Sequence, residues 1–305
     1  MTWKLSLLSL CFALECAACQ SHLSRPQAEG EEVASQLNAR YYDTRMSCDD
    51  NKPAYYCNGV IVRATGAGTD HDAWDLTESQ LQLGGVSFSY LRADVGSRRL
   101  YGEKEGRPHG YIFKAADAYD EPDTFPAVIL CSFPYDAVTT GRTERGCGAY
   151  SSYPESSRPC AELGIDTVEA WRKHFGEVTD IVWQHYHQCG FGADQQGFAL
   201  SILARDRSLV VNEFFVHTEQ MIGTWTSQDA ARLPMAAIFY TEGEDVDIGR
   251  KGARYIQCRY LAVTGKVIPI VRFVTDENLE PYSYRGDDQA APSDCASVFA
   301  SAGTH

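Results

Sequence analysis

Cysteine content constrains this chain more than any other feature of its sequence. The 305 residues include 11 cysteines, of which three fall within the first nineteen positions. The remaining ones are even in number: Cys48, Cys57, Cys131, Cys147, Cys160, Cys189, Cys258 and Cys295. In an exported protein such a set predicts four disulfides. We expect Cys48 to pair with Cys57, because the loop between them is short and contains Pro53. No CxxC spacing occurs among these eight, so a cysteine-based metal site is not expected.

The first residues have the pattern of a targeting segment. Lys4 precedes an apolar run, and small residues follow it. This pattern predicts a signal peptide over residues 1–18, and the run is too short to span a membrane. The end of the segment, Ala17-Ala18-Cys19, resembles a bacterial lipobox. Two outcomes stay open: ordinary cleavage near Ala18, or lipidation of Cys19. We therefore expect a secreted bacterial protein, or one that is periplasmic or anchored in the outer membrane.

The chain is acidic, with a formal net charge of −14. This sign argues against nucleic acid and anionic membrane surfaces as partners, which leaves a lipid anchor at Cys19 as the expected membrane contact. An anionic substrate would need a local basic patch. The span 92–107 offers one, since it includes Arg92 among several other basic residues. Its alternative interpretation is a solvated loop.

Hydrophobic periodicity predicts an α+β fold with two halves of different character. A polar tether over 19–30 precedes one domain over 31–280, and a polar tail over 281–305 follows, held only by Cys295. The half from 48 to 150 is strand-rich, after a helix at 31–42. Strands are expected at 59–65, 86–92, 111–115 and 127–133.

The half from 160 to 280 is predicted to be helix-rich. Asp166 is expected to cap a helix that carries Glu169 three residues later, and a second helix is expected within 194–208. The pattern then predicts a strand at 234–241, a helix at 248–264 that ends at Gly265, and a strand at 266–274. Strand, helix and strand with short joints indicate a βαβ unit. Pro269 should lie at a sheet edge or bulge.

Two strand positions are candidates for ligand contact. The strand at 86–91 places Ser87 and Ser89 on one face, where they either bond to neighbouring strands and water or line a ligand pocket. Arg63 interrupts an apolar strand. It is either a surface ion pair or an inward guanidinium that grips a phosphate through two parallel N–H groups.

Two carboxylates are candidate catalytic acids. Glu242 directly follows a buried strand, near the start of a helix whose dipole favours acids. Glu213 is flanked by apolar residues, and such a buried glutamate is either catalytic or a structural partner of an arginine. His185 and His187 alone do not indicate a metal, and no phosphate-binding or dinucleotide-binding glycine motif occurs. We therefore expect neither a metal nor a bound cofactor.

A series of short motifs resembles one known family. The motifs, in order, are NGVIVRAT at 58–65, GGVSFSYLRAD at 84–94, CSFPYDA at 131–137, HQCGF at 187–191, VNEF at 211–214 and LPMAAIFYTE at 233–242. Together they resemble the halovibrin family over roughly residues 40–275. These are exported bacterial proteins described as NAD glycohydrolases or ADP-ribosyltransferases. The resemblance implies that the domain is catalytic and that NAD is its substrate.

Bacterial ADP-ribosyltransferase toxins often carry an early-strand arginine, a Ser-x-Ser strand and a Glu-x-Glu loop. The elements of this chain that are similar to them are Arg63, Ser87-Phe88-Ser89 and Glu242-Gly243-Glu244. The long interval between Ser87 and Glu242 departs from that pattern and keeps Glu213 as the rival acid.

If NAD is the substrate, the chemistry of its cleavage leads us to hypothesise roles for these residues. One glutamate would stabilise the developing cation at the ribose. Arg63, with Arg92, would bind the pyrophosphate, and the two serines would orient the ribose. Phe88, Tyr90 or Trp74 would stack on a ring. Two other functions stay open: transfer of ADP-ribose to a protein acceptor, and a non-enzymatic binding module of the envelope.

Overall fold

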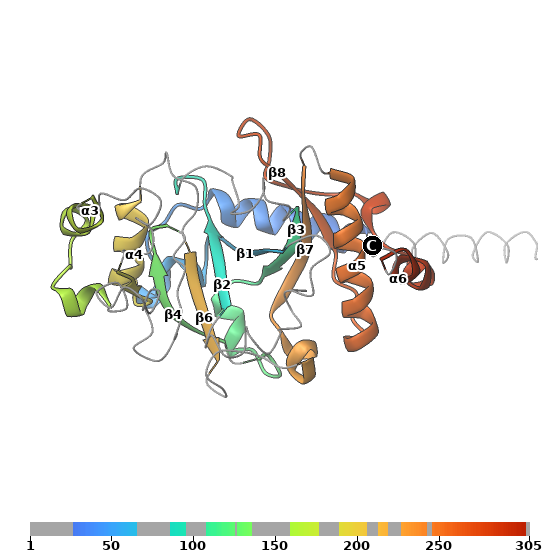
Figure 1. Cartoon of the computed structure of the whole chain (residues 1–305), viewed down its shortest axis with the longest axis horizontal. Coiled ribbons are helices and arrows are strands. Elements are labelled where there is room, and N and C mark those ends of the chain that lie inside the picture. Colours follow the sequence, from blue (N-terminus) through green and yellow to red (C-terminus); the bar gives the residue numbers. More distant parts are fainter. Residues whose placement is uncertain are drawn as a thin grey trace, which may run out of the picture.

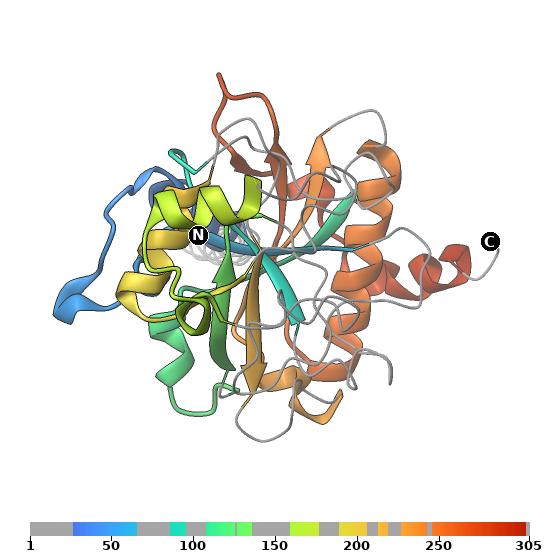
Figure 2. The ribbon, with the colours of Figure 1, turned by 60° about the vertical axis from the view of Figure 1, so that its left-hand side comes forward.

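The computed structural model describes residues 27–65, 86–95, 108–125, 127–135, 159–176, 189–205, 213–218, 227–242 and 246–302. Over these ranges the chain forms a nine-stranded sheet with helices on both faces (Figure 1; Figure 2). The predicted α+β class is confirmed, with strands dominating the first half and helices the second.

The described strands alternate in sequence with helices and turns. They are β1 (Val60–Thr65), β2 (Val86–Leu91), β3 (His109–Phe113), β4 (Ala127–Phe133), β5 (Phe191–Gly192), β6 (Glu213–Thr218), β7 (Met235–Glu242), β8 (Ile270–Val274) and β9 (Tyr282–Tyr284). Their order in the sheet is β5-β4-β6-β2-β1-β3-β7-β8-β9. Among these neighbours only β7 and β8 run parallel. The order brings β6, far along the sequence, next to β2.

The longer helices lie at residues 27–42 and in α3 (Val168–Gly176), α4 (Gln195–Ala204), α5 (Val246–Thr264) and α6 (Cys295–Ala302). Short 3-10 turns are η1 (Asp49–Asn51), η2 (Ala54–Tyr56), η4 (Ala116–Asp120), η5 (Cys160–Leu163), η7 (Ser227–Arg232), η8 (Gly286–Asp288) and η9 (Pro292–Asp294). Figure 1 shows α3 and α4 beside β4 at one end of the sheet, and α5 and α6 at the other.

The helix at 27–42, which we call the first helix, covers one face of the sheet. Ala34, Leu37 and Tyr41 are its buried apolar side chains. They pack on alternate strand residues, namely Val60, Val62, Leu91, Ile112, Ala237, Phe239, Val271 and Phe273. Because side chains alternate across a strand, the residues between these belong to the opposite face.

Helices α4 and α5 cover that opposite face. Phe198 of α4 and Ile256 of α5 are buried with strand residues that include Ile61, Phe88 and Tyr111. Phe88 and Tyr111 meet edge to face, with ring centroids 5.7 Å apart. The apolar half of the 86–91 pattern therefore forms core.

The predicted βαβ unit is present as β7, α5 and β8, with the two strands parallel. Gly265 ends α5 in the left-handed conformation, with φ of 70°, and its N–H donates to the Leu261 carbonyl. Gly252 lets α5 approach β3 closely, since a Cβ there would lie 2.4 Å from the His109 ring. Pro269 lies just before β8 rather than within it, and its carbonyl accepts from the Ile238 N–H.

Two local predictions were wrong. Thr167, not Asp166, caps α3, because its Oγ1 accepts from the Ala170 N–H at 3.1 Å. The segment after residue 280 is not a tail held only by Cys295. Tyr282 lies in β9 with 1% exposure. Its N–H and carbonyl both bond to the side chain of Asn38 on the first helix.

Disulfides join Cys48 to Cys57, as predicted, and also Cys160 to Cys189 and Cys258 to Cys295. Cys131 is buried in β4. Cys147 lies outside the described residues, as do Cys19 and the leader, so a fourth disulfide and lipidation stay predictions. Disulfides of this kind persist in oxidising compartments.

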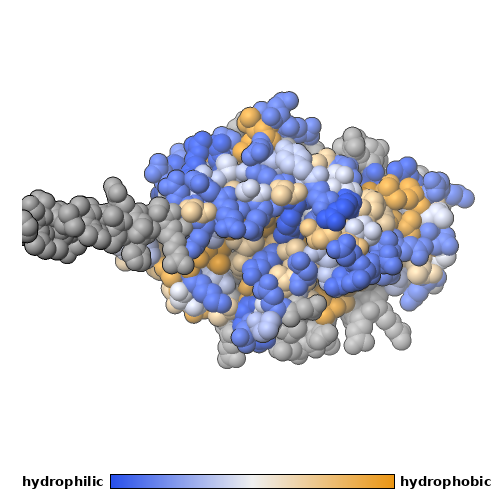
Figure 3. All heavy atoms as spheres, turned by 180° about the vertical axis from the view of Figure 1, so that it is seen from behind, coloured by the Kyte–Doolittle hydropathy of each residue, from blue (hydrophilic) through white to orange (hydrophobic). Residues whose placement is uncertain are grey.

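The molecule seen from behind is mostly hydrophilic, with scattered hydrophobic areas (Figure 3). Exposed large apolar side chains in the described ranges include Tyr42, Leu203 and Val267, and isolated residues of this kind are normal on protein surfaces. In the described part of the chain, no helix is both long and apolar enough to cross a membrane.

Candidate functional site

Arg63 lies in β1 and is tied to the neighbouring strand β2. Its Nη1 donates to the backbone carbonyl of Ser87 at 2.7 Å. In the β1–β3 register Arg63 stands opposite Tyr111, so it shares the face that carries α4 and α5. Burial raises the pKa of Tyr111, and the Arg63 guanidinium acts in the opposite direction. The guanidinium is therefore tied to β2 by a hydrogen bond and interacts electrostatically with Tyr111 on β3.

Ser87 and Ser89 lie on the other face. Ser89 stands opposite Val62 in the β1–β2 register, and Val62 packs under the first helix. Both serines are partly exposed, whereas Phe88, which lies between them, and Tyr90, which follows them, are buried. The guanidinium of Arg63 and the two hydroxyls thus project from opposite faces. The contact between Arg63 and β2 is made through main chain.

Glu213 begins β6, the strand on the other side of β2. The β2–β6 register places Glu213 opposite Ser89, and Phe215 opposite Ser87. Strands β1, β2 and β6 are consecutive in the sheet. The structure therefore brings the backbone positions of Arg63, the serine pair and Glu213 together on three adjacent strands.

Glu242 lies elsewhere. It ends β7, which is separated from β2 by β1 and β3. Its Oε1 accepts from Arg272 Nη1 on β8 at 3.0 Å, and the glutamate side chain is 42% exposed. The structure does not bring Glu242 to the serines. Glu244 lies outside the described residues.

A second polar cluster surrounds the carboxyl ends of β7 and β8, and we call it the β7–β8 cluster. Tyr240 donates to Asp288 Oδ2 at 2.7 Å, and Arg250 lies 3.9 Å from the other oxygen of that carboxylate. Burial raises the pKa of Tyr240, and the hydrogen bond to Asp288 adds to the effect. Arg254 holds the same turn by donating to the carbonyl of Asp288.

His109 borders this cluster, opposite Tyr240 in the β3–β7 register. It is 3% exposed, and its Nδ1 has no hydrogen-bond partner among the described residues. Burial lowers its pKa from 6.5 to about 4, so the imidazole is neutral at pH 7. No group of three metal-ligating side chains occurs in the described ranges.

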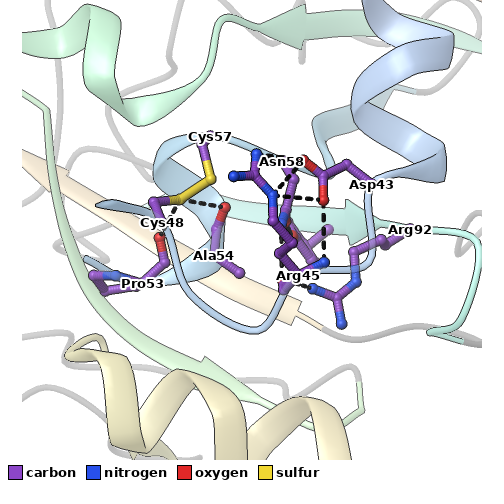
Figure 4. Close-up of polar contacts among 9 residues, drawn as sticks. Asp43, Arg45, Cys48, Pro53, Ala54, Cys57, Asn58 and Arg92 are labelled. Atoms are coloured by element: carbon purple, nitrogen blue, oxygen red, sulfur yellow. Dashed lines mark hydrogen bonds and ion pairs between the residues drawn. A yellow bond between two sulfur atoms is a disulfide. The ribbon is translucent and has the colours of Figure 1, made fainter. Parts of the chain in front are cut away.

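Arg92 lies at the opposite end of β2 from Arg63 and is 1% exposed. Its Nε and Nη2 donate to the carboxylate of Asp94. Its Nη1 donates to the carbonyl of Arg45 (Figure 4). A side chain held in this way stabilises the loop beside the Cys48–Cys57 disulfide. The structure does not place it with the other candidates, and sequence reasoning missed its ion pair with Asp94 two residues away.

The predicted ring-stacking residues are also placed. Phe88 and Tyr90 are core residues, with 1% and 0% exposure, and the Tyr90 hydroxyl donates to Asn58 Oδ1 at 2.5 Å. Trp74, His185 and His187 lie outside the described residues.

No family model matches the chain, and a comparison with curated proteins gave no match.

Proposed function

We propose that this protein cleaves the bond between nicotinamide and ribose in NAD, and that Glu213 supplies the catalytic carboxylate. One observation carries the choice of acid: β6 pairs with the serine strand β2 and places Glu213 opposite Ser89. The combination of an arginine strand, a Ser-x-Ser strand and a glutamate is similar to the elements that bacterial ADP-ribosyltransferase toxins often carry. Glu242, in contrast, lies on β7, two strands beyond β1, and its carboxylate accepts from Arg272.

The proposed reaction needs little acid catalysis. The C–N bond breaks and its electron pair stays on the nicotinamide nitrogen, which thereby becomes neutral. The ribose carbon develops oxocarbenium character, which a carboxylate stabilises. Water then adds to that carbon and releases a proton, which leaves ADP-ribose. One contact of this type contributes about 3–4 kcal/mol to lowering a barrier.

Arg63 is proposed as a positioning residue in this reaction. Its Nη1 is bonded to the Ser87 carbonyl, on the face opposite the serine hydroxyls. Holding this carbonyl fixes β2 relative to β1. The orientation of Ser87 and Ser89 therefore depends on Arg63 through main chain.

The first test compares Glu213→Gln with Glu242→Gln in the exported chain with its disulfides formed. Release of nicotinamide from NAD is followed by chromatography. We expect kcat to fall about 10²–10³-fold for Glu213→Gln, because the amide loses the negative charge. We expect less than about a threefold change for Glu242→Gln, because this side chain is 42% exposed and pairs with Arg272, away from the serines.

Three results would count against the proposal. Full activity of Glu213→Gln with loss in Glu242→Gln would reverse the choice of acid. If the wild-type chain released no nicotinamide, the enzymatic function would be rejected, and a non-enzymatic binding module of the envelope would be the favoured function. With labelled NAD and bacterial or host extract, a labelled protein band would indicate transfer to a protein rather than hydrolysis.

A further inference from the structure

The three described disulfides differ in how far they are buried. Cys160 and Cys189 are 1% and 0% exposed, and Cys258 is 1% exposed, so two of the bonds have at least one buried cysteine. In the third bond Cys48 and Cys57 are both partly exposed. A disulfide opens when a thiolate attacks one of its sulfur atoms, and the rate depends on access to that atom. Cys48–Cys57 is therefore the most accessible of the three to a small thiol.

The loop that this disulfide closes is also the shortest. Cys48 and Cys57 are 9 positions apart, whereas the other two bonds join cysteines 29 and 37 positions apart. A disulfide stabilises a protein mainly by restricting the unfolded chain, and this restriction is smaller for a shorter loop. Opening the Cys48–Cys57 bond is therefore expected to cost the fold less stability than opening either of the others.

The loop between these cysteines is held in place by contacts that do not involve the disulfide. Tyr55 is 4% exposed, and its ring meets Phe198 of α4 edge to face with centroids 4.8 Å apart. The Tyr55 hydroxyl donates to the Ala193 carbonyl at 2.6 Å. Pro53 and Ala54 beside it are buried. These contacts remain when the S–S bond is open, so the loop stays packed against α4.

Hydrogen bonds also join the two ends of the loop (Figure 4). The Arg45 carbonyl, a little before Cys48, accepts from Asn58 Nδ2 at 2.7 Å and from Arg92 Nη1 at 2.8 Å. Asn58 directly follows Cys57 and is 0% exposed, so water does not easily compete for its bond. The two cysteines therefore remain close to each other after reduction, which lets the disulfide form again.

The surroundings of Cys48 also suit a reduced thiol. Its Sγ lies 3.2 Å from the Pro53 carbonyl oxygen and 3.4 Å from that of Ala54 (Figure 4). In the disulfide this sulfur has no proton to donate. A Cys48 thiol has one, and S–H is a weak donor to carbonyl oxygens. The reduced form thus gains a hydrogen bond without movement of the loop, and a disulfide is easier to reduce when its reduced form is stabilised.

We propose that Cys48–Cys57 is a reversible exchange site for low-molecular-weight thiols. The thiolate of one small thiol attacks one sulfur, and the other cysteine leaves as a thiolate that takes a proton from water. A second small thiol attacks the small thiol's sulfur in this mixed disulfide and releases the remaining cysteine, which is protonated in turn. In sum, two small thiols are oxidised to their disulfide, and the two cysteines gain two electrons and two protons. The site is independent of the proposed NAD reaction.

Glutathione is the probe, and the full exported chain with its disulfides formed is the sample. Cysteines that open are trapped with iodoacetamide, and peptide mass spectrometry locates the label. In excess reduced glutathione, Cys48 and Cys57 should be labelled at least about tenfold faster than Cys160, Cys189 and Cys258, because access limits exchange. Oxidised glutathione added before the iodoacetamide should remove this labelling. Thermal unfolding of the reduced sample should still show one cooperative transition.

Tyr55→Phe tests whether the anchored loop makes the exchange reversible. This variant should close its disulfide in oxidised glutathione about fivefold more slowly than the wild type, because the reduced loop loses the hydrogen bond to Ala193. Tyr56→Phe is the matched control. Its ring is the neighbouring one and is partly exposed, so the rate of closure should not change. Equal rates of closure in all three proteins would overturn the role of the anchored loop and with it the proposal.

The double variant Cys48→Ser, Cys57→Ser tests whether the fold tolerates the open bond. It should unfold in one transition, and its remaining cysteines should be labelled as slowly as in the wild type. An unfolded double variant would overturn the proposal, because the disulfide would then be a structural requirement. Labelling of Cys48 and Cys57 no faster than that of the buried cysteines, or only in denaturant, would overturn it as well.

Discussion

Two parts of one sheet each contain an arginine and a glutamate, but these residues bond to each other in only one of the two parts. In the β7–β8 cluster, Arg272 and Glu242 lie on adjacent parallel strands and bond to each other at 3.0 Å. In the part formed by β1, β2 and β6, Arg63 bonds to a carbonyl of the strand that separates it from Glu213. The order of strands, rather than the order of residues along the chain, decides which acid an arginine can meet. The β7–β8 cluster is therefore framework, and the β1–β2–β6 part is the proposed site.

If that division is right, changes in the β7–β8 cluster and its neighbours should alter stability, and changes in the β1–β2–β6 part should alter turnover. The substitution of Glu213 described above has the largest expected effect on turnover. The following predictions examine the division from the larger effect to the smaller.

Acid should destabilise the folded chain through His109. The unfolded state takes up a proton near pH 6.5, but the folded state does so only near pH 4. Lowering the pH through this window therefore favours the unfolded state, and the effect is complete below pH 4. The expected loss is up to about 3 kcal/mol of unfolding free energy. Urea unfolding between pH 7.5 and 4.5 measures it.

His109→Asn is the comparison variant for this effect, because it removes the titrating ring. The difference between wild type and variant isolates the histidine from carboxylates that titrate in the same range. Parallel curves for the two proteins over this pH window would contradict the buried position of His109 against α5.

Tyr240→Phe should lower the unfolding free energy by about 2 kcal/mol, because a buried carboxylate loses its hydrogen-bond donor. Asp288 is 3% exposed, so water cannot easily replace the phenol. Nicotinamide release per folded molecule should stay unchanged. A fall in kcat without a change in urea midpoint would place Tyr240 in the reaction and end the division proposed above.

Arg63→Lys should lower kcat about tenfold and leave the KM for NAD unchanged. Lysine keeps the charge but cannot hold the Ser87 carbonyl with the same planar geometry. The split between kcat and KM decides the role of this residue. A raised KM with normal kcat would restore direct contact with the pyrophosphate. Arg272→Lys is the matched control and should keep both constants.

Much of the fold follows from local pattern. The short apolar run at 127–133 predicts β4 with the bounds that the structure has, and the strand, helix and strand near the C-terminus predict the parallel pair. β9 was missed because it is three residues long and its alternation, Tyr-Ser-Tyr, is too short to stand out. Thr167 and Asp166 are both good caps, and only backbone geometry distinguishes them.

The site was less accessible to sequence reasoning, for a physical reason. Whether Glu213 or Glu242 lies near Ser89 depends on which strand pairs with β2, and strand pairing is a non-local contact. Arg92 was misplaced because a basic loop predicts a solvated side chain, whereas Asp94 and the Arg45 carbonyl bury it. The opposite faces of Arg63 and the serines do follow from alternation, once β1 and β2 are known to be neighbours.

The bonds between Asn38 and Tyr282 have a consequence for how the chain matures. They connect residues 244 positions apart, so the first helix cannot complete its contacts until almost all of the polypeptide has emerged. A chain shortened before β9 leaves that amide without its partner and the hydrogen-bonding edge of β8 unpaired. The contacts between the first helix and this end of the sheet therefore form only once residues 282–284 are available.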